Sequence, residues 1–202
     1  MVVPEPNQHW GIFGGVFDPV HRGHIQLAED IAPQAALDGV LFVPSWRPPH
    51  RQIIPQADYA HRLCMLELAL ESHPTFSLST IERDMPEPGY TLNVVRQLKQ
   101  RHPHVSFDFI LGADNLASFK TWYRWDELLA EIHILAGARP GHAASPTSDL
   151  PDRAVTFVST GTWDVSSTRI RELIASGTRP EKLTSLLPDG VAAYISEHGL
   201  YV

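Results

Sequence analysis

Cysteine is almost absent from this sequence, because its 202 residues include one, Cys64. A single cysteine excludes an intramolecular disulfide, and it favours a chain that works in the reducing cytoplasm. Cys64 lies in an apolar pattern with helical spacing. We therefore expect it to fill space in the core rather than to act as a nucleophile.

The sequence also lacks long apolar runs and an excess of basic charge. No run approaches the roughly 20 apolar residues that a membrane-spanning helix needs, and residues 1–8 show no signal-peptide pattern. The formal net charge of −7 argues against a broad nucleic-acid-binding surface. We expect one globular domain over residues 1–202, with neither a membrane nor a nucleic acid as partner.

Short apolar runs alternate with amphipathic segments along the chain, which predicts an open, doubly wound, mostly parallel α/β sheet. We expect strands at 9–14, 40–43, 76–81, 107–111, 132–136 and 155–158. We expect helices at 21–38, 58–72, 91–102, 116–119, 125–131, 167–176 and 191–198. Residues 1–8 are predicted to form a loose tail, 140–152 a mobile surface loop, and 165–202 a helical C-terminal part.

The first unusual stretch is Gly11-Ile-Phe-Gly-Gly-Val-Phe-Asp-Pro-Val-His-Arg-Gly-His24, where a strand gives way to a helix. Gly14 and Gly15 let a ligand approach the backbone closely. His21 and His24 are three residues apart, so they share one helix face beside N–H groups that favour phosphate. The alternatives are two surface or capping histidines or a zinc site, but no cluster of cysteine or carboxylate completes a set of zinc ligands. The stretch predicts a phosphate site.

The second stretch is Asp164-Val-Ser-Ser-Thr-Arg-Ile-Arg171. Ser166, Ser167 and Thr168 can cap a new helix and offer donors to a phosphate. Arg171 follows Ser167 by four residues and Thr168 by three, so it shares their face and can reach the same anion. Alone, the stretch favours a plain helix cap followed by a solvated arginine, and the phosphate interpretation depends on the first stretch. Two more unusual stretches, Gly112–Asn115 and Gly137–Arg139, also follow predicted strands, where ligands of such sheets bind.

These two phosphate stretches resemble the His-x-Gly-His nucleotidyltransferase superfamily, and most closely the bacterial-type nicotinate mononucleotide adenylyltransferases. Val165 stands where that family has isoleucine. The resemblance implies a Rossmann-like nucleotidyltransferase fold and transfer of the adenylyl group of ATP to nicotinate mononucleotide. The products would be deamido-NAD and pyrophosphate, in NAD biosynthesis. Mg²⁺ is expected as cofactor, chelated mainly by the triphosphate and water rather than by a protein metal site.

The resemblance also implies roles for individual residues. His24 would contact the transferred phosphate and His21 the neighbouring ones, with Arg171 as a third catalytic residue. The ATP-binding residues would be Gly14, Gly15, Phe17, His21, His24, Gly112, Asp114, Arg139, Ser166, Ser167, Thr168 and Arg171. The acceptor-binding residues would be Ser45, His50, Arg51, Tyr90, Thr91, Asp114, Trp122 and Tyr123. Trp122 would stack on the pyridine ring, and the loop Pro44–Arg51 would close over the acceptor.

Other functions stay open at this stage. Pantetheine-phosphate adenylyltransferases share both phosphate motifs, but Trp122-Tyr123 and the Pro-Pro-His-Arg51 loop disfavour them. A cytidylyltransferase fits less well. A non-catalytic nucleotide-binding module would show damage to one motif, and the sequence shows none. The sequence decides neither between nicotinate and nicotinamide as the ring nor between a monomer and a homodimer.

Overall fold

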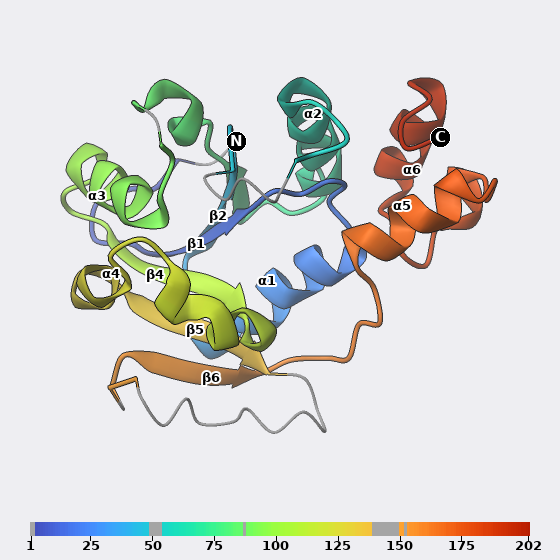
Figure 1. Ribbon diagram of the computed structural model, residues 1–202. Coiled ribbons are helices and arrows are strands. Elements are labelled where there is room, and N and C mark those ends of the chain that lie inside the picture. Colours follow the sequence, from blue (N-terminus) through green and yellow to red (C-terminus); the bar gives the residue numbers. More distant parts are fainter. Residues whose placement is uncertain (1–2, 49–53, 87, 139–149, 152) are drawn as a thin grey trace.

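The computed structural model describes residues 3–48, 54–86, 88–138, 150–151 and 153–202. Its centre is a six-stranded sheet in which every paired strand is parallel to its neighbour (Figure 1). The order is β3-β2-β1-β4-β5-β6. The strands are β1 (His9–Gly15), β2 (Gly39–Pro44), β3 (Phe76–Leu78), β4 (Ser106–Gly112), β5 (His133–Ala138) and β6 (Val155–Ser159). The predicted doubly wound parallel sheet is confirmed.

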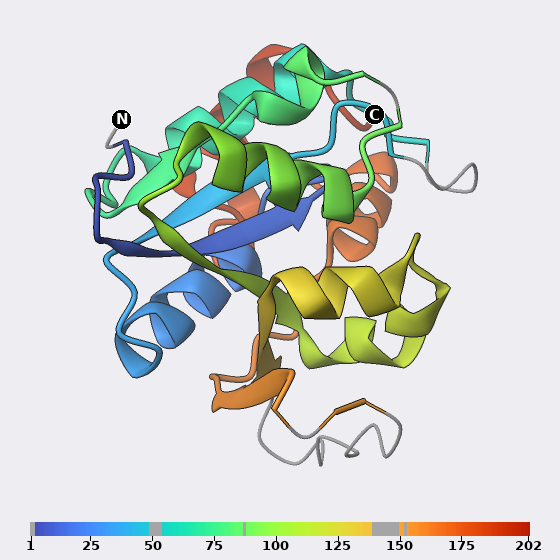
Figure 2. The ribbon, with the colours of Figure 1, turned by 90° about the vertical axis from the view of Figure 1, so that its left-hand side faces the viewer.

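Helices cover both faces of this sheet, and each face has its own core. The α-helices are α1 (Arg22–Gln34), α2 (Tyr59–Leu70), α3 (Thr91–Arg101), α4 (Trp125–Glu131), α5 (Ser167–Ala175) and α6 (Asp189–Glu197). The 3₁₀ helices are η1 (Ile81–Asp84), η2 (Ala113–Thr121) and η3 (Pro180–Lys182). One core joins α1, α2, α5 and α6 to one face, and the other joins α3, η2 and α4 to the opposite face (Figures 1 and 2).

Side-chain alternation along the strands produces these two cores. In β2, Val40 and Phe42 enter the core of α1 and α2, whereas Leu41 and Val43 enter the core of α3. Successive residues of a strand point to opposite faces, so a strand covered on both sides is apolar throughout. All six residues of β2 are buried. Among the described residues, no helix is long and apolar enough to cross a membrane.

Three segments differ from the expected elements. Helix α1 ends at Gln34 rather than at 38, because Ala36 takes a left-handed φ of 50° and the Leu37 N–H donates to the Ala32 carbonyl at 2.9 Å. Strand β3 stops at Leu78, and η1 follows as a separate turn. Helix η2 is longer than the predicted piece at 116–119. The short helix η3 has no predicted counterpart, and the other helices and strands lie within two residues of their predicted bounds.

Cys64 is only half-buried on α2, so the prediction that it fills space in the core is wrong. The single-domain prediction stays a prediction. Most of the predicted loop 140–152 lies outside the described residues.

Candidate active site

The carboxyl ends of β1 and β4 mark the point where the strand order reverses, and ligands of open α/β sheets bind there. Two cavities open at this edge. The first, here called the histidine cleft, has a volume of about 310 Å³ and is lined by Phe13, Gly14, Gly15, Phe17, His21, Gly23, His24, Leu27, Gly112, Ala113, Asp114, Asn115, Gly137, Thr160, Gly161, Trp163, Val165 and Ser166.

The second cavity, here called the aromatic cavity, has a volume of about 730 Å³. It is lined by Ile12, Phe13, Gly14, Gly15, Val16, Val43, Ser45, Pro48, Glu82, Gly89, Tyr90, Thr91, Val94, Phe109, Leu111, Asn115, Ser118, Thr121, Trp122 and Tyr123. Phe13, Gly14, Gly15 and Asn115 line both cavities, so the two adjoin at the end of β1.

The glycines at the end of β1 leave backbone exposed where the cavities meet. A Cβ on Gly15 would lie 3.0 Å from the Phe17 ring, closer than ordinary packing allows. Phe17 itself takes a left-handed φ of 52° and is 2% exposed. Its ring packs edge-on against Phe13 and His24, with centroid separations of 5.6 and 5.0 Å. Phe17 therefore supports the histidine cleft from the core and offers it little side-chain surface.

The two predicted histidines cap helix α1 and face each other. His21 is the N-cap residue, and its backbone N–H donates to Nδ1 of His24 at 3.2 Å. The rings stack with centroids 3.6 Å apart. Because Nδ1 of His24 accepts this bond, the proton of the neutral ring lies on Nε2, which makes Nε2 a donor. Burial, followed by the charge of His21, holds the pKa of His24 well below 6.5. His24 is therefore neutral near pH 7 when no anion is bound.

These histidines are capping residues, as one alternative expected, and they also line the histidine cleft. Among the described residues, no group of three or more His, Cys, Asp or Glu side chains could hold a metal ion. The geometry thus gives no support to the zinc alternative in the part of the chain that the structure describes. The N-terminal N–H groups of α1 and the two imidazoles are instead groups that can bind an anion, and the anion site stays a prediction.

The start of helix α5 is tied directly to the turn before α1. The Ser166 side chain accepts from the Arg169 N–H at 3.2 Å and lines the histidine cleft. The Ser167 hydroxyl donates to the Pro19 carbonyl at 2.8 Å, and Arg171 Nη1 donates to the Asp18 carbonyl at 2.7 Å. These bonds hold the N-termini of α1 and α5 beside the same cleft.

Ser167, Thr168 and Arg171 do not line the cleft themselves. Arg171 contacts the Thr168 hydroxyl at 3.4 Å, as their shared face predicts. Their expected contacts with a phosphate stay predictions. In the structure, the Ser167 hydroxyl and Nη1 of Arg171 each donate to a carbonyl of the neighbouring turn. Ile170 is fully buried, as expected.

The aromatic cavity gathers five of the predicted acceptor residues: Ser45, Tyr90, Thr91, Trp122 and Tyr123. The Trp122 ring is supported by Phe119, at a centroid distance of 5.1 Å, and edge-on by Phe109, at 6.0 Å. The rings of Tyr90 and Tyr123 stack at 4.1 Å. Thr91 begins helix α3, whose first N–H groups have no partner within the helix and suit an anionic group.

Asp114 was predicted to bind both ATP and the acceptor. It lines the histidine cleft but not the aromatic cavity. Its neighbour Asn115 lines both. Three predicted site residues, His50, Arg51 and Arg139, lie outside the described residues.

Three buried charged residues around the two cavities were not predicted as site residues. Arg62 is 1% exposed, and it donates to the Val16 carbonyl at 2.6 Å and to the Ser45 carbonyl at 2.9 Å. Asp18 accepts from the Gln56 N–H at 2.7 Å and from the Tyr201 hydroxyl at 2.8 Å. Glu82 is 6% exposed in the wall of the aromatic cavity.

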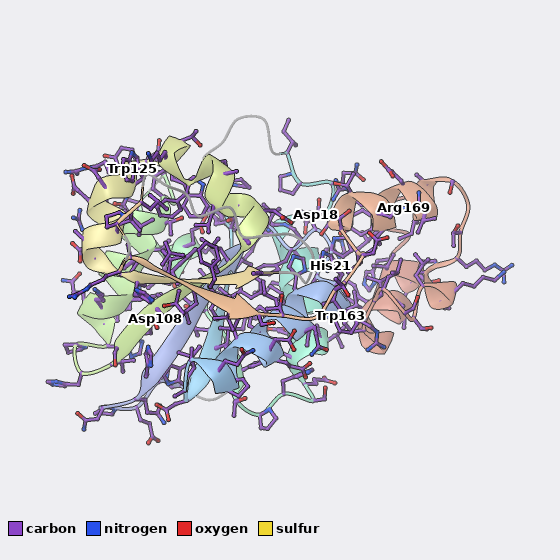
Figure 3. The ribbon with its side chains drawn as sticks, turned by 90° about the horizontal axis from the view of Figure 1, so that it is seen from below. Asp18, His21, Asp108, Trp125, Trp163 and Arg169 are labelled. Carbon is purple, nitrogen blue, oxygen red and sulfur yellow. The ribbon has the colours of Figure 1, made fainter. Side chains whose placement is uncertain are left out.

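A sequence signal did exist for Arg62. It shares the buried face of α2 with Tyr59, Met65, Leu66 and Ala69, and a charge on such a face is retained where it is paired. Figure 3 places Asp18, His21 and Trp163 where the sheet meets the C-terminal helices, far from Trp125.

Known proteins resemble this chain over almost its whole length. A family model described as cytidylyltransferase-like matches residues 12–173. A Bacillus subtilis protein named nicotinate-nucleotide adenylyltransferase is 42% identical over 193 residues, covering 95% of this chain and 97% of the relative. The chain belongs to the nicotinate-nucleotide adenylyltransferase family. A Bacillus pumilus protein named as a probable member of this family is 41% identical over 191 residues, with the same coverage of both chains.

The family has the fold described above. A structure of Plasmodium falciparum nicotinic acid mononucleotide adenylyltransferase complexed with NaAD superposes with a TM-score of 0.80 at 19% identity, covering 96% of this chain and 97% of that one. Membership of this family within the broader cytidylyltransferase-like group confirms the family that the two phosphate motifs indicated.

Proposed function

We propose that this protein transfers the adenylyl group of ATP to nicotinate mononucleotide, producing deamido-NAD and pyrophosphate for NAD biosynthesis. The observation that carries the proposal is the pair of adjoining cavities. One offers histidines and helix N-termini, which suit a triphosphate, and the other offers aromatic rings, which suit a pyridine. The Gly14-Gly15 backbone lies where the two substrates would meet.

In the proposed reaction, a phosphate oxygen of nicotinate mononucleotide attacks the α-phosphorus of ATP and pyrophosphate leaves from the opposite side. No covalent enzyme intermediate is needed, because the acceptor phosphate is itself the nucleophile and attacks the α-phosphorus directly. The protein contributes position and charge stabilisation. The Nε2 donor of His24 and the N-terminus of α1 would stabilise charge on the transferred phosphate.

His21 and Ser166 would bind neighbouring phosphate oxygens, and Gly112 and Asp114 would contact ATP from the end of β4, since they line the same cleft. Three residues at the start of α5 would bind ATP: Arg171, Ser167 and Thr168. Arg139 would also lie near the triphosphate. In the aromatic cavity, Trp122 and Tyr123 would contact the pyridine ring. The N–H groups at Tyr90 and Thr91 would receive its carboxylate. Ser45, His50 and Arg51 would close over the acceptor.

Mg²⁺ is proposed to enter with ATP. Of the described residues that line the histidine cleft, Asp114 alone is acidic, which suits an ion held mainly by phosphate oxygens and water. When bound, it would neutralise part of the triphosphate charge. The single cysteine supports a cytoplasmic location.

The test is pyrophosphate release with ATP and Mg²⁺, with three acceptors in parallel: nicotinate mononucleotide, nicotinamide mononucleotide and phosphopantetheine. We expect strong preference for the first, because a carboxylate suits the N-terminus of α3. Activity with phosphopantetheine alone would refute the acceptor assignment and retain the nucleotide assignment. Binding of ATP without release for any acceptor would indicate the non-catalytic alternative.

A further inference from the structure

Glu82 is a buried carboxyl group in the wall of the aromatic cavity. It belongs to the short helix η1 and is 6% exposed. Of the described residues that line this cavity, it alone is acidic. Glutamate is rarely buried without a partner that compensates for lost hydration. The contacts of this carboxyl group therefore indicate why it lies there.

The Glu82 carboxyl group lies between two segments of the cavity wall. On one side, the Trp46 N–H donates to Oε1 at 3.0 Å. On the other, the backbone of Gly89 comes so close that a Cβ there would lie 2.5 Å from Oε1. Gly89 directly precedes Tyr90, the N-cap of helix α3. One carboxyl group thus bonds to residues 44–48 on one side and packs against the turn at 88–91 on the other.

Arg62 fixes the same segment from beneath. Its guanidinium donates to the Ser45 carbonyl at 2.9 Å, one residue before the N–H that Glu82 accepts. The Trp46 ring packs edge-on against Tyr59 of α2 at 4.7 Å. The peptide between Ser45 and Trp46 is therefore held at its carbonyl by a buried cation and at its N–H by a buried carboxyl group.

We propose that Glu82 is a positioning residue for the acceptor, because its carboxylate fixes residues 44–48 against the 88–91 turn and so sets the shape of the aromatic cavity. This inference rests on the proposed function, in which that cavity receives nicotinate mononucleotide. A bond from a peptide N–H to a carboxylate is stronger than a bond to a neutral group. Without the bond from the Trp46 N–H to Glu82, residues 44–48 must become ordered during acceptor binding. This cost raises KM for the acceptor.

The charge of Glu82 varies near neutral pH. Burial raises its pKa from 4.5 to about 7, while the N–H groups of Trp46 and Arg47 and the charge of Arg62 act in the opposite direction. The charged and titratable neighbours are Arg62 and Tyr59 on α2, Arg47 in the 44–48 segment, Arg83 and Asp84 on η1, and Tyr90 in the 88–91 turn.

Because the carboxylate is the form that holds the segment best, KM for the acceptor is expected to rise as the pH falls. If only the carboxylate is effective, a pKa near 7 gives an increase of about tenfold between pH 8 and pH 6.

The experiment compares wild-type protein with Glu82→Gln, Glu82→Ala and the control Asp84→Asn, which changes a half-exposed carboxylate on the same turn. KM for nicotinate mononucleotide, KM for ATP and kcat are measured at pH 6, 7 and 8. We expect acceptor KM at pH 8 to rise about fivefold in Glu82→Gln and at least tenfold in Glu82→Ala, with ATP KM within twofold of wild type. Asp84→Asn should match the wild type.

The acceptor phosphate also titrates in this range, so each variant is compared with the wild type at the same pH. The ratio of the acceptor KM of Glu82→Gln to that of the wild type should shrink toward one at pH 6, where the wild-type carboxyl group is itself protonated. An unchanged acceptor KM, equal rises in both KM values, or a ratio independent of pH would overturn the proposal. Glutamine has nearly the same shape as glutamate, so this variant supplies the answer if Glu82→Ala does not fold.

Failure of the proposed function would be seen separately, as absence of wild-type activity with nicotinate mononucleotide. In that case the same comparison is made with whichever acceptor the wild type uses. Loss of wild-type activity with every acceptor would overturn both proposals.

Discussion

Replacing Glu82 by glutamine is expected to stabilise the protein more at high pH than at low pH. The folded-state pKa of Glu82 is raised to about 7 from its ordinary 4.5. A raised pKa means that the folded state favours the protonated acid. The stability that protonated Glu82 contributes to the folded state is therefore fully present below pH 4.5, and it is lost as the pH rises through 7.

The magnitude follows from the two pKa values. At about 1.4 kcal/mol per pKa unit, ionised Glu82 costs the folded state on the order of 3 kcal/mol well above pH 7. The side chain is 6% exposed, so solvent screening reduces this figure little. Glutamine resembles the protonated acid at every pH. Its advantage over glutamate should thus grow by roughly 2 kcal/mol between pH 5 and pH 8.

Urea unfolding at pH 5, 6, 7 and 8 measures this difference. With an m value of about 2 kcal/mol/M, the separation between the two midpoints should widen by roughly 1 M over the series. Glu67→Gln, which changes an exposed carboxylate on α2, is the matched control and should show no such trend. A separation that stays constant or narrows with rising pH would refute the reasoning. The same substitution is expected to weaken acceptor binding, so stability and function would change in opposite directions.

Two further substitutions test other parts of the site. His24→Ala removes the Nε2 donor that is proposed to contact the transferred phosphate, and it should lower kcat by about 10²–10³ while circular dichroism stays native; near-normal turnover in a folded variant would remove His24 from the mechanism. Tyr201→Phe deletes the hydroxyl that donates to buried Asp18 and should lower the free energy of unfolding by about 1–3 kcal/mol in urea titrations. An unchanged midpoint would mean that this bond contributes nothing net.

Local signals in the sequence predicted most of the fold. Runs of apolar residues and caps such as Asp58, which accepts from the His61 N–H at 3.0 Å, depend on neighbours within a few residues. The early end of α1 escaped prediction because alanine, rather than glycine, takes the left-handed position at Ala36.

The residues of the candidate site also divide into those that a local motif predicts and those that depend on distant parts of the chain. His21, His24 and the glycines of β1 belong to one continuous motif, so their proximity could be predicted. The buried charges could not, because Arg62 reaches the carbonyl of Val16, 46 residues earlier, and Glu82 reaches the N–H of Trp46, 36 residues earlier. Such pairings appear only once the sheet order brings the segments together.

The bond between Tyr201 and Asp18 joins residues 183 positions apart in the chain. Contacts of such long sequence separation form slowly, because the intervening chain must first give up its freedom. Asp18 also anchors Gln56 and, through its carbonyl, Arg171. We therefore expect the turn that carries His21 to complete its contacts only when the region around Tyr201 docks, so the histidine cleft depends on a residue 183 positions away in the chain.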